Sequence, residues 1–159
     1  MKITIFGTGY VGLVTAGCLV HKNHEVICYD TDEDRIDDLH RGNVPIFEPG
    51  LDELIASGVN SGRLLFTSSF KEPLKNPDII ILCVGTPDDG TGATSLKAIE
   101  SCAATICEVS NFSVPVLIKS TVPVGTAVKI QNLINTGLKN RKIDIKIPVA
   151  SNPEFLHEG

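Results

Sequence analysis

Short apolar runs recur along the whole chain and are separated by segments that mix apolar and charged residues. The runs are rich in Val and Ile and mostly apolar on both faces, which is typical of parallel strands buried beneath helices. We therefore predict strands at five clear runs and at one weaker run. The clear runs are residues 2–6, 25–29, 78–84, 114–120 and 145–151, and the weaker run is residues 63–67.

The segments between these runs have the spacing of amphipathic helices. In residues 95–109, apolar residues recur at the intervals that place them on one helical face. A turn-rich stretch, residues 41–50, precedes a short helix that we predict from about Leu51. The other predicted helices are residues 11–22, 32–41 and 125–138.

This alternation of strand and helix predicts an α/β fold. Short connections between parallel strands imply right-handed crossovers. We therefore expect a Rossmann-like, doubly wound, mainly parallel sheet with helices on both faces. No internal repeat, low-complexity tract or linker interrupts the pattern, so residues 1–159 are expected to form one domain.

Composition argues against several classes of function. The chain has a formal net charge of −5, and six Phe and two Tyr are its only aromatic residues. We therefore expect neither the basic footprint nor the stacking platform of a protein that binds nucleic acid. No apolar segment reaches the length of a membrane span, so no membrane partner is expected.

The five cysteines lack the paired spacing of a metal site, and no metal is expected. Cys18, Cys28 and Cys83 lie inside apolar stretches, where free cysteine behaves as a small buried hydrophobe. Cys102 and Cys107 are five residues apart on a predicted helix, so they should face different directions. Reduced thiols favour a cytoplasmic location.

Residues 5–12, IFGTGYVG, place Gly7, Gly9 and Gly12 between the first predicted strand and the first predicted helix. The G-x-G-x-x-G spacing in this context indicates a dinucleotide-binding turn. Gly7 would form the tight turn, Gly9 would let the backbone approach the pyrophosphate, and Gly12 would let the helix pack closely on the strand. The N-terminus of that helix would face the anion.

Asp30 ends the second predicted strand, 18 residues beyond Gly12, where a carboxylate that binds the adenosine ribose is expected. Residues 32–34 are also acidic, so a 2′-phosphate would meet concentrated negative charge and NAD is favoured over NADP. An alternative or additional role for Asp30 is the N-cap of the following helix. Arg35 either turns back to the phosphates or lies on a solvated helix face.

Three further loops follow predicted strands and should meet the glycine turn at one edge of the sheet. They span residues 83–90, 119–126 and 151–159 and carry Thr86 and Pro87, Ser120 and Thr121, and Glu154 and Glu158, respectively. Each loop alone is explained by turn residues and helix caps. Three such loops at one edge favour a binding site.

Five motifs, in this order, resemble the UDP-glucose/GDP-mannose dehydrogenases: GTGYVG, PIFEPGLDELI, VGTP, KSTVPVGT and NPEFLHEG. The resemblance covers essentially the whole chain. It implies that a nucleotide sugar is oxidised at C6 to a carboxylate, with two NAD and a cysteine-bound thioester. UDP-glucose is the favoured sugar and GDP-mannose the alternative. An unrelated NAD-dependent reductase would leave the last two motifs unexplained.

The resemblance also implies roles for individual residues. Residues of the glycine turn hold the pyrophosphate, Thr121 and Glu154 position and activate water, and Glu158 lies near the nicotinamide and the sugar. The implied cofactor-binding residues are Gly7, Thr8, Gly9, Tyr10, Val11, Gly12, Asp30, Arg35, Val84, Gly85, Thr86, Pro87, Ser120, Thr121, Val122 and Glu158. The implied catalytic residues are Thr121, Glu154 and Glu158, and the implied substrate-binding residues are Glu154, Phe155 and Leu156.

In this family the nucleophilic cysteine belongs to a glycine-rich motif that the resemblance places beyond Gly159. The central helix and the sugar-binding domain are expected there too. We therefore expect this chain to bind NAD without turning over sugar, and the full-length enzyme to be a homo-oligomer. The alternative is a stand-alone nucleotide-binding module.

Overall fold

The computed structural model of the chain describes residues 1–71 and 73–155. In these residues the chain forms one six-stranded sheet in the order β3-β2-β1-β4-β5-β6, and every pair of neighbouring strands is parallel. The strands are β1 (Lys2–Phe6), β2 (Glu25–Tyr29), β3 (Leu64–Thr67), β4 (Ile79–Leu82), β5 (Val116–Ile118) and β6 (Val149–Ser151). The predicted doubly wound α/β fold is confirmed, although most strands are shorter than the apolar runs.

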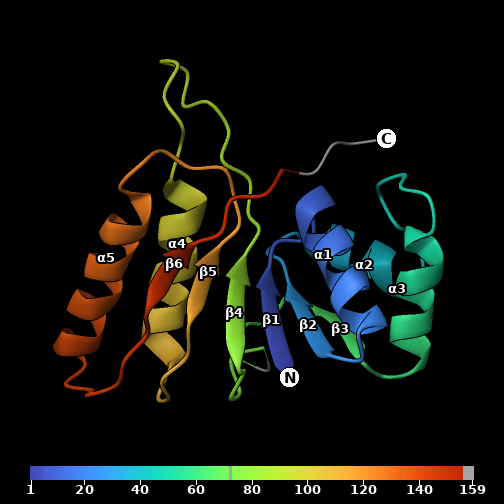
Figure 1. Cartoon of the computed structure of the whole chain (residues 1–159), viewed down its shortest axis with the longest axis horizontal. Helices are drawn as coiled ribbons and strands as arrows, with labels where there is room; N and C mark the ends of the chain where they lie inside the picture. Colours follow the sequence, from blue (N-terminus) through green and yellow to red (C-terminus); the bar gives the residue numbers. More distant parts are fainter. Residues whose placement is uncertain (72, 156–159) are drawn as a thin grey trace.

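Helices cover both faces of the sheet. They are α1 (Tyr10–His21), α2 (Glu33–His40), α3 (Leu51–Asn60), α4 (Lys97–Val109) and α5 (Thr126–Asn140). Figure 1 shows α4 and α5 on one side of the sheet and α1, α2 and α3 on the other. All six strands end at the upper edge in that view, where the loops that follow them gather.

The central strands are buried on both faces because their side chains alternate between two apolar cores. Ile3 and Ile5 of β1 pack in the core beneath α1, α2 and α3, whereas Phe6 packs in the core beneath α4 and α5. In β4, Ile81 joins the first core and Leu82 the second. This two-residue period explains why the sequence of these strands is apolar almost throughout.

The last strand differs from its prediction. Residues 145–151 were expected to form a strand, but only Val149–Ser151 pair with β5, and this edge strand is largely exposed. The side chain of Gln131 in α5 accepts a hydrogen bond from Val149 N at 2.8 Å and donates one to the Ile147 carbonyl at 3.0 Å. Gln131 therefore holds the Ile147 carbonyl against the helix, whereas the Pro148 carbonyl still accepts a hydrogen bond from Val116 N of β5 at 2.8 Å.

One prediction about the cysteines is wrong. Cys28 and Cys83 are buried, but Cys18 is exposed. Cys18 lies two residues after the buried Ala16 of α1, and this spacing turns it away from the core. Cys102 and Cys107 face different neighbours: Cys102 lines a pocket beside β2, whereas the Cys107 thiol donates a hydrogen bond to the Ile134 carbonyl of α5.

Candidate dinucleotide site

The three glycines of the G-x-G-x-x-G motif have three different environments. Gly7 has a φ of +101°, and a Cβ there would lie 2.6 Å from the Cys83 carbonyl oxygen. A Cβ on Gly12 would lie 2.1 Å from the Gly7 carbonyl oxygen, whereas a Cβ on Gly9 would meet nothing within 4 Å. Gly7 and Gly12 therefore serve the turn and the helix contact, and Gly9 leaves open space at the surface.

The start of α1 is suited to an anion. Among the described residues, no side chain caps this helix, and its first turn holds no acidic residue. Gly9 is the N-cap, and Tyr10 is the first helical residue. Backbone N–H groups and the helix dipole favour a phosphate at such an end. The open space at Gly9 would let a pyrophosphate reach it, so the residues present fit the expected cofactor.

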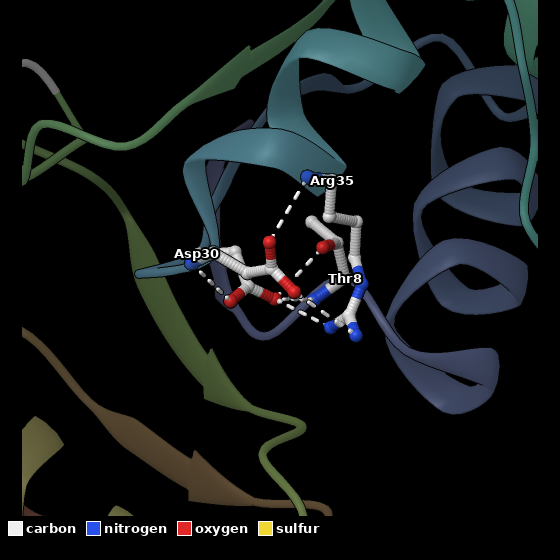
Figure 2. Close-up of polar contacts among 4 residues, drawn as sticks. Thr8, Asp30 and Arg35 are labelled. Carbon is white, nitrogen blue, oxygen red and sulfur yellow. Dashed lines mark hydrogen bonds and ion pairs between the residues drawn. The ribbon is translucent and has the colours of Figure 1, made fainter.

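Asp30 is bound tightly to the glycine turn. Its Oδ2 accepts hydrogen bonds from both the backbone N and the Oγ1 of Thr8, each at 2.7 Å, and its Oδ1 accepts one from Asp32 N at 3.1 Å. Arg35 Nη1 lies 3.5 Å from Oδ2. Figure 2 shows Thr8 and Arg35 approaching the carboxylate from the turn and from α2.

These contacts set the charge of Asp30. Partial burial raises the pKa of its carboxyl, but the hydrogen bonds from Thr8 and Asp32 and the charge of Arg35 outweigh burial, so the net pKa is lowered. Thr8 is fully buried, and the Asp30 side chain is 12% exposed. Asp30 is therefore an oriented, ionised acceptor at the end of β2.

Two of the alternative roles are decided by the structure. The N-cap of α2 is Asp32, whose side chain accepts a hydrogen bond from Arg35 N at 3.0 Å, so the expected N-cap role of Asp30 is wrong. The Arg35 guanidinium lies 3.5 Å from Asp30 and 3.3 Å from Asp32 and is 39% exposed, so it is not simply a solvated residue. Its contact with phosphates stays a prediction.

Two hollows flank the glycine turn, and Val84 lines both of them. The pocket at the Asp30 side has a volume of about 110 Å³ and lies between the end of β2 and α4. The cleft on the other side has a volume of about 290 Å³ and lies between the start of α1 and the loops after β4 and β5. This arrangement suits a ligand with two halves joined by a diphosphate.

The cleft brings most of the predicted residues of the second half together. Thr86 Oγ1 donates a hydrogen bond to the Thr121 carbonyl at 2.9 Å, and Ser120 Oγ donates one to the Val84 carbonyl at 2.6 Å. These bonds tie the two loops to each other. The predicted residues that line the cleft are Gly9, Tyr10, Val11, Val84, Gly85, Thr86, Ser120, Thr121 and Glu154.

Other predicted residues lie away from the cleft or support it. Thr8 and Gly12 are buried behind the turn. Pro87 and Val122 are not among the described residues that line either hollow, and Phe155 is 87% exposed. Leu156 and Glu158 lie outside the described residues.

A cysteine lines each hollow, and neither has the character of a nucleophile. Burial raises the pKa of Cys83 in the cleft to about 12, and burial raises the pKa of Cys102 in the Asp30-side pocket to about 12. Both groups are therefore thiols near neutral pH, and a thiol is a far weaker nucleophile than a thiolate.

Several residues of the Asp30-side pocket were missed by the sequence analysis. They are Tyr29, Ala98, Ser101, Cys102 and Thr105. The small residues of α4 recur at intervals of three and four, so the helical spacing that identified this helix could also have identified its pocket face.

In the described part of the chain, no helix is long and apolar enough to cross a membrane. No group of His, Cys, Asp and Glu side chains in those residues could hold a metal ion.

Comparison with known proteins agrees with this geometry. The model of the UDP-glucose/GDP-mannose dehydrogenase family, NAD binding domain, matches residues 1–159. A UDP-glucose 6-dehydrogenase of Rhizobium meliloti is 45% identical and a GDP-mannose 6-dehydrogenase of Pseudomonas putida is 40% identical, each over all of this chain and 36% or 37% of the relative. The chain thus spans about a third of the length of the curated relatives it matches.

Solved structures give the same result. A ternary complex of GDP-mannose dehydrogenase from Pseudomonas aeruginosa has a TM-score of 0.89 at 39% identity, and the match covers 99% of this chain and 37% of that one. A UDP-glucose dehydrogenase from Pyrobaculum islandicum has a TM-score of 0.87 at 34% identity, with coverage of 99% and 37%. Because the family model matches the whole chain and the fold agrees, the chain belongs to the UDP-glucose/GDP-mannose dehydrogenase family, as its NAD-binding domain.

Proposed function

We propose that this chain is the NAD-binding domain of a UDP-glucose 6-dehydrogenase, which oxidises UDP-glucose to UDP-glucuronate with two NAD through a cysteine thioester. The preference for UDP-glucose is supported by relatives of that name at 39–45% identity, against 38–40% for the GDP-mannose 6-dehydrogenases. GDP-mannose is the second candidate, because the two ranges of identity overlap and the solved structures similar to this chain include both a GDP-mannose dehydrogenase and a UDP-glucose dehydrogenase.

The observation that carries NAD binding is the pair of hollows joined across the glycine turn beside Asp30. We assign the adenosine to the Asp30-side pocket, the diphosphate to the turn between Gly7 and Gly12, and the nicotinamide half to the cleft. The Oδ1 of Asp30 accepts one hydrogen bond, so it keeps capacity for a ribose hydroxyl. Bound NAD supplies the acceptor for the hydride that leaves the sugar carbon.

The chain's own residues have positioning and proton-handling roles in this proposal. The hydrogen bonds of Ser120 and Thr86 hold the two loops of the cleft together, so the loops are already ordered when a ligand binds. Glu154 lines the same cleft as Thr121. A carboxylate beside a hydroxyl can hold a water molecule and accept its proton, which is the chemistry that thioester hydrolysis needs.

Cofactor choice follows from charge near the ribose. Asp30 is followed by Asp32 and by the exposed Glu33 and Asp34 in the first turn of α2, and Arg35 pairs with Asp30 and Asp32. A 2′-phosphate would have to displace Arg35 from its partners and approach the remaining acids. We therefore expect NAD to bind at least 10-fold more tightly than NADP, which corresponds to about 1.4 kcal/mol.

Calorimetric titration of the chain with NAD and NADP tests this proposal. Asp30→Asn keeps the shape of the side chain. It should weaken the binding of NAD and leave the affinity for NADP nearly unchanged. Equal affinities for the two cofactors, or no binding of NAD, would overturn the assignment of the pocket. No NADH should form when the chain is mixed with NAD and UDP-glucose. The sugar is tested on the whole polypeptide, where UDP-glucose should reduce NAD faster than GDP-mannose does.

A further inference from the structure

The segment Val44–Glu48 belongs to a motif of the family resemblance for which the cofactor site described so far gives no role. Its side chains alternate between two sides. Val44 and Ile46 pack against the core beneath α1, α2 and α3, whereas Phe47 is 87% exposed. Glu48 is partly buried and continues the inward-facing series. A carboxylate thus lies on the inner side of an otherwise apolar segment.

The hydrogen-bond partner of this carboxylate is Tyr10, a residue that lines the cleft. Tyr10 donates its phenol hydrogen bond to Glu48 Oε2 at 3.1 Å, in a partly buried contact. Tyr10 is the first residue of α1 and lines the 290 Å³ cleft. Burying a carboxylate is costly unless it accepts hydrogen bonds, so this contact favours one placement of the phenol ring.

The segment that carries Glu48 is anchored on both sides. Ile46 packs on the core before it, and after it the Glu48 carbonyl accepts a hydrogen bond from Leu51 N at 3.0 Å. Leu51 then packs closely on α1, since a Cβ on Gly17 would lie 3.1 Å from its Cδ1. Glu48 is therefore held in a fixed position relative to the helix that begins with Tyr10.

We propose that Glu48 is a positioning residue of the dinucleotide site, holding the Tyr10 ring as one wall of the cleft for the nicotinamide half. This inference rests on the proposed function. Thr86 and Thr121, on the loops after β4 and β5, line the same cleft. The Asp30-side pocket does not include Tyr10 among its described lining residues, so a ligand confined to that pocket and the turn does not sense the ring.

The test compares NAD with ADP, which lacks the nicotinamide half. Glu48→Met removes the acceptor with little change in size and should weaken NAD by about 3- to 10-fold, a fraction of what a charge-assisted hydrogen bond contributes. The affinity for ADP should fall by less than about 2-fold, because the contacts that ADP makes are unchanged. Glu48→Gln keeps an acceptor oxygen and should restore most of the NAD affinity. Calorimetry gives both dissociation constants.

Two further variants complete the design. Tyr10→Phe deletes one oxygen atom, keeps the backbone that faces the turn, and should reproduce the loss even if Glu48→Met folds poorly. Glu53→Met makes the same change on the exposed first turn of α3 and should alter neither affinity. Combining Tyr10→Phe with Glu48→Met should cost no more than the larger of the two single losses, because the hydrogen bond between the two residues can be lost only once.

The outcomes separate this inference from the proposed function. Equal weakening of NAD and ADP, unchanged NAD affinity, or an equal effect of Glu53→Met would overturn the role of Glu48 while leaving the NAD site in place. Failure of the unmodified chain to bind NAD would overturn both.

Discussion

Alanine at Gly9 and at Gly12 should separate cofactor binding from folding. A Cβ on Gly12 would lie 2.1 Å from the Gly7 carbonyl oxygen, about 1.3 Å short of the 3.4 Å at which ordinary contact begins. That oxygen belongs to the backbone of the turn and cannot rotate away. Helix α1 must therefore move off the turn, although Leu13 and Ala16 of this helix are fully buried in the core.

The cost of Gly12→Ala follows from this overpacking. Extra atoms in a packed site cost typically 1–3 kcal/mol, and a rigid backbone neighbour favours the upper end, so we expect about 3 kcal/mol. For a domain of this size each kcal/mol lowers Tm by roughly 2–4 °C, which gives a decrease of about 6–12 °C.

Gly9→Ala should behave in the opposite way. Nothing lies within 4 Å of its Cβ position, and φ −76° with ψ −170° is open to alanine. Reduced freedom of the unfolded chain favours alanine by about 0.4–1 kcal/mol, and the poorer helix cap offsets much of this gain. Stability should thus stay within about 0.5 kcal/mol. The added methyl group occupies the approach to α1, so NAD should bind about 10- to 100-fold more weakly.

Thermal melting by circular dichroism and calorimetric titration with NAD measure the two effects. Each variant is the control for the other, because both make the same chemical change three residues apart, at the N-cap and in the first turn of α1. A large loss of stability in Gly9→Ala, or full NAD affinity, would refute the reading of Gly9 as the open approach to the phosphates. A Gly12→Ala protein as stable as the original would refute the close contact of α1 with the turn.

Three further predictions concern stability and reactivity. Thr8→Val should lower the free energy of unfolding by about 0.5–1.5 kcal/mol at neutral pH. The lowered pKa of Asp30 gives stability that is present above pH 3.8 and is lost as the pH falls through the folded-state pKa. The cost of the substitution, measured by urea unfolding, should therefore be smaller in acid. Arg141→Met removes hydrogen bonds to the last carbonyls of α4 and should lower the unfolding free energy by about 1–3 kcal/mol in the same assay. A thiol reagent should label only Cys18 rapidly in the native protein and all five cysteines in denaturant; rapid labelling of a second thiol would contradict the burial of the others.

The order of strands and helices, and the place of the glycine turn, could be predicted because each rests on local spacing. β4 is apolar throughout, and β1 is apolar apart from Lys2 and Thr4, because both faces of these strands are covered. The exposure of Cys18 was available from the same kind of spacing, because helical period turns it away from the residues that face the core. The burial of a helical residue such as Cys18 is predicted better by its angular position around the helix axis than by apolar neighbours along the chain.

Features that depend on contacts between distant segments could not be predicted. The Tyr10–Glu48 hydrogen bond joins residues 38 positions apart, and no local pattern marks them as partners. The hydrogen bonds of the Gln131 side chain to Ile147 and Val149 likewise join residues 16 and 18 positions apart. The partners of Arg35 are a different case: Asp30 and Asp32 are its near neighbours in the sequence, and neither of the two roles expected for Arg35, contact with the phosphates and a solvated helix face, included them.

The contacts of Asp30 explain why the turn is ready for a ligand before one arrives. Its Oδ2 is engaged by Thr8, which belongs to the turn itself, so the carboxylate that would hold the ribose also fixes the loop that would hold the diphosphate. The Oδ1 accepts a single backbone hydrogen bond and is the oxygen with capacity to spare. Ordering of the turn is therefore completed during folding, and little of the binding free energy has to be spent on it.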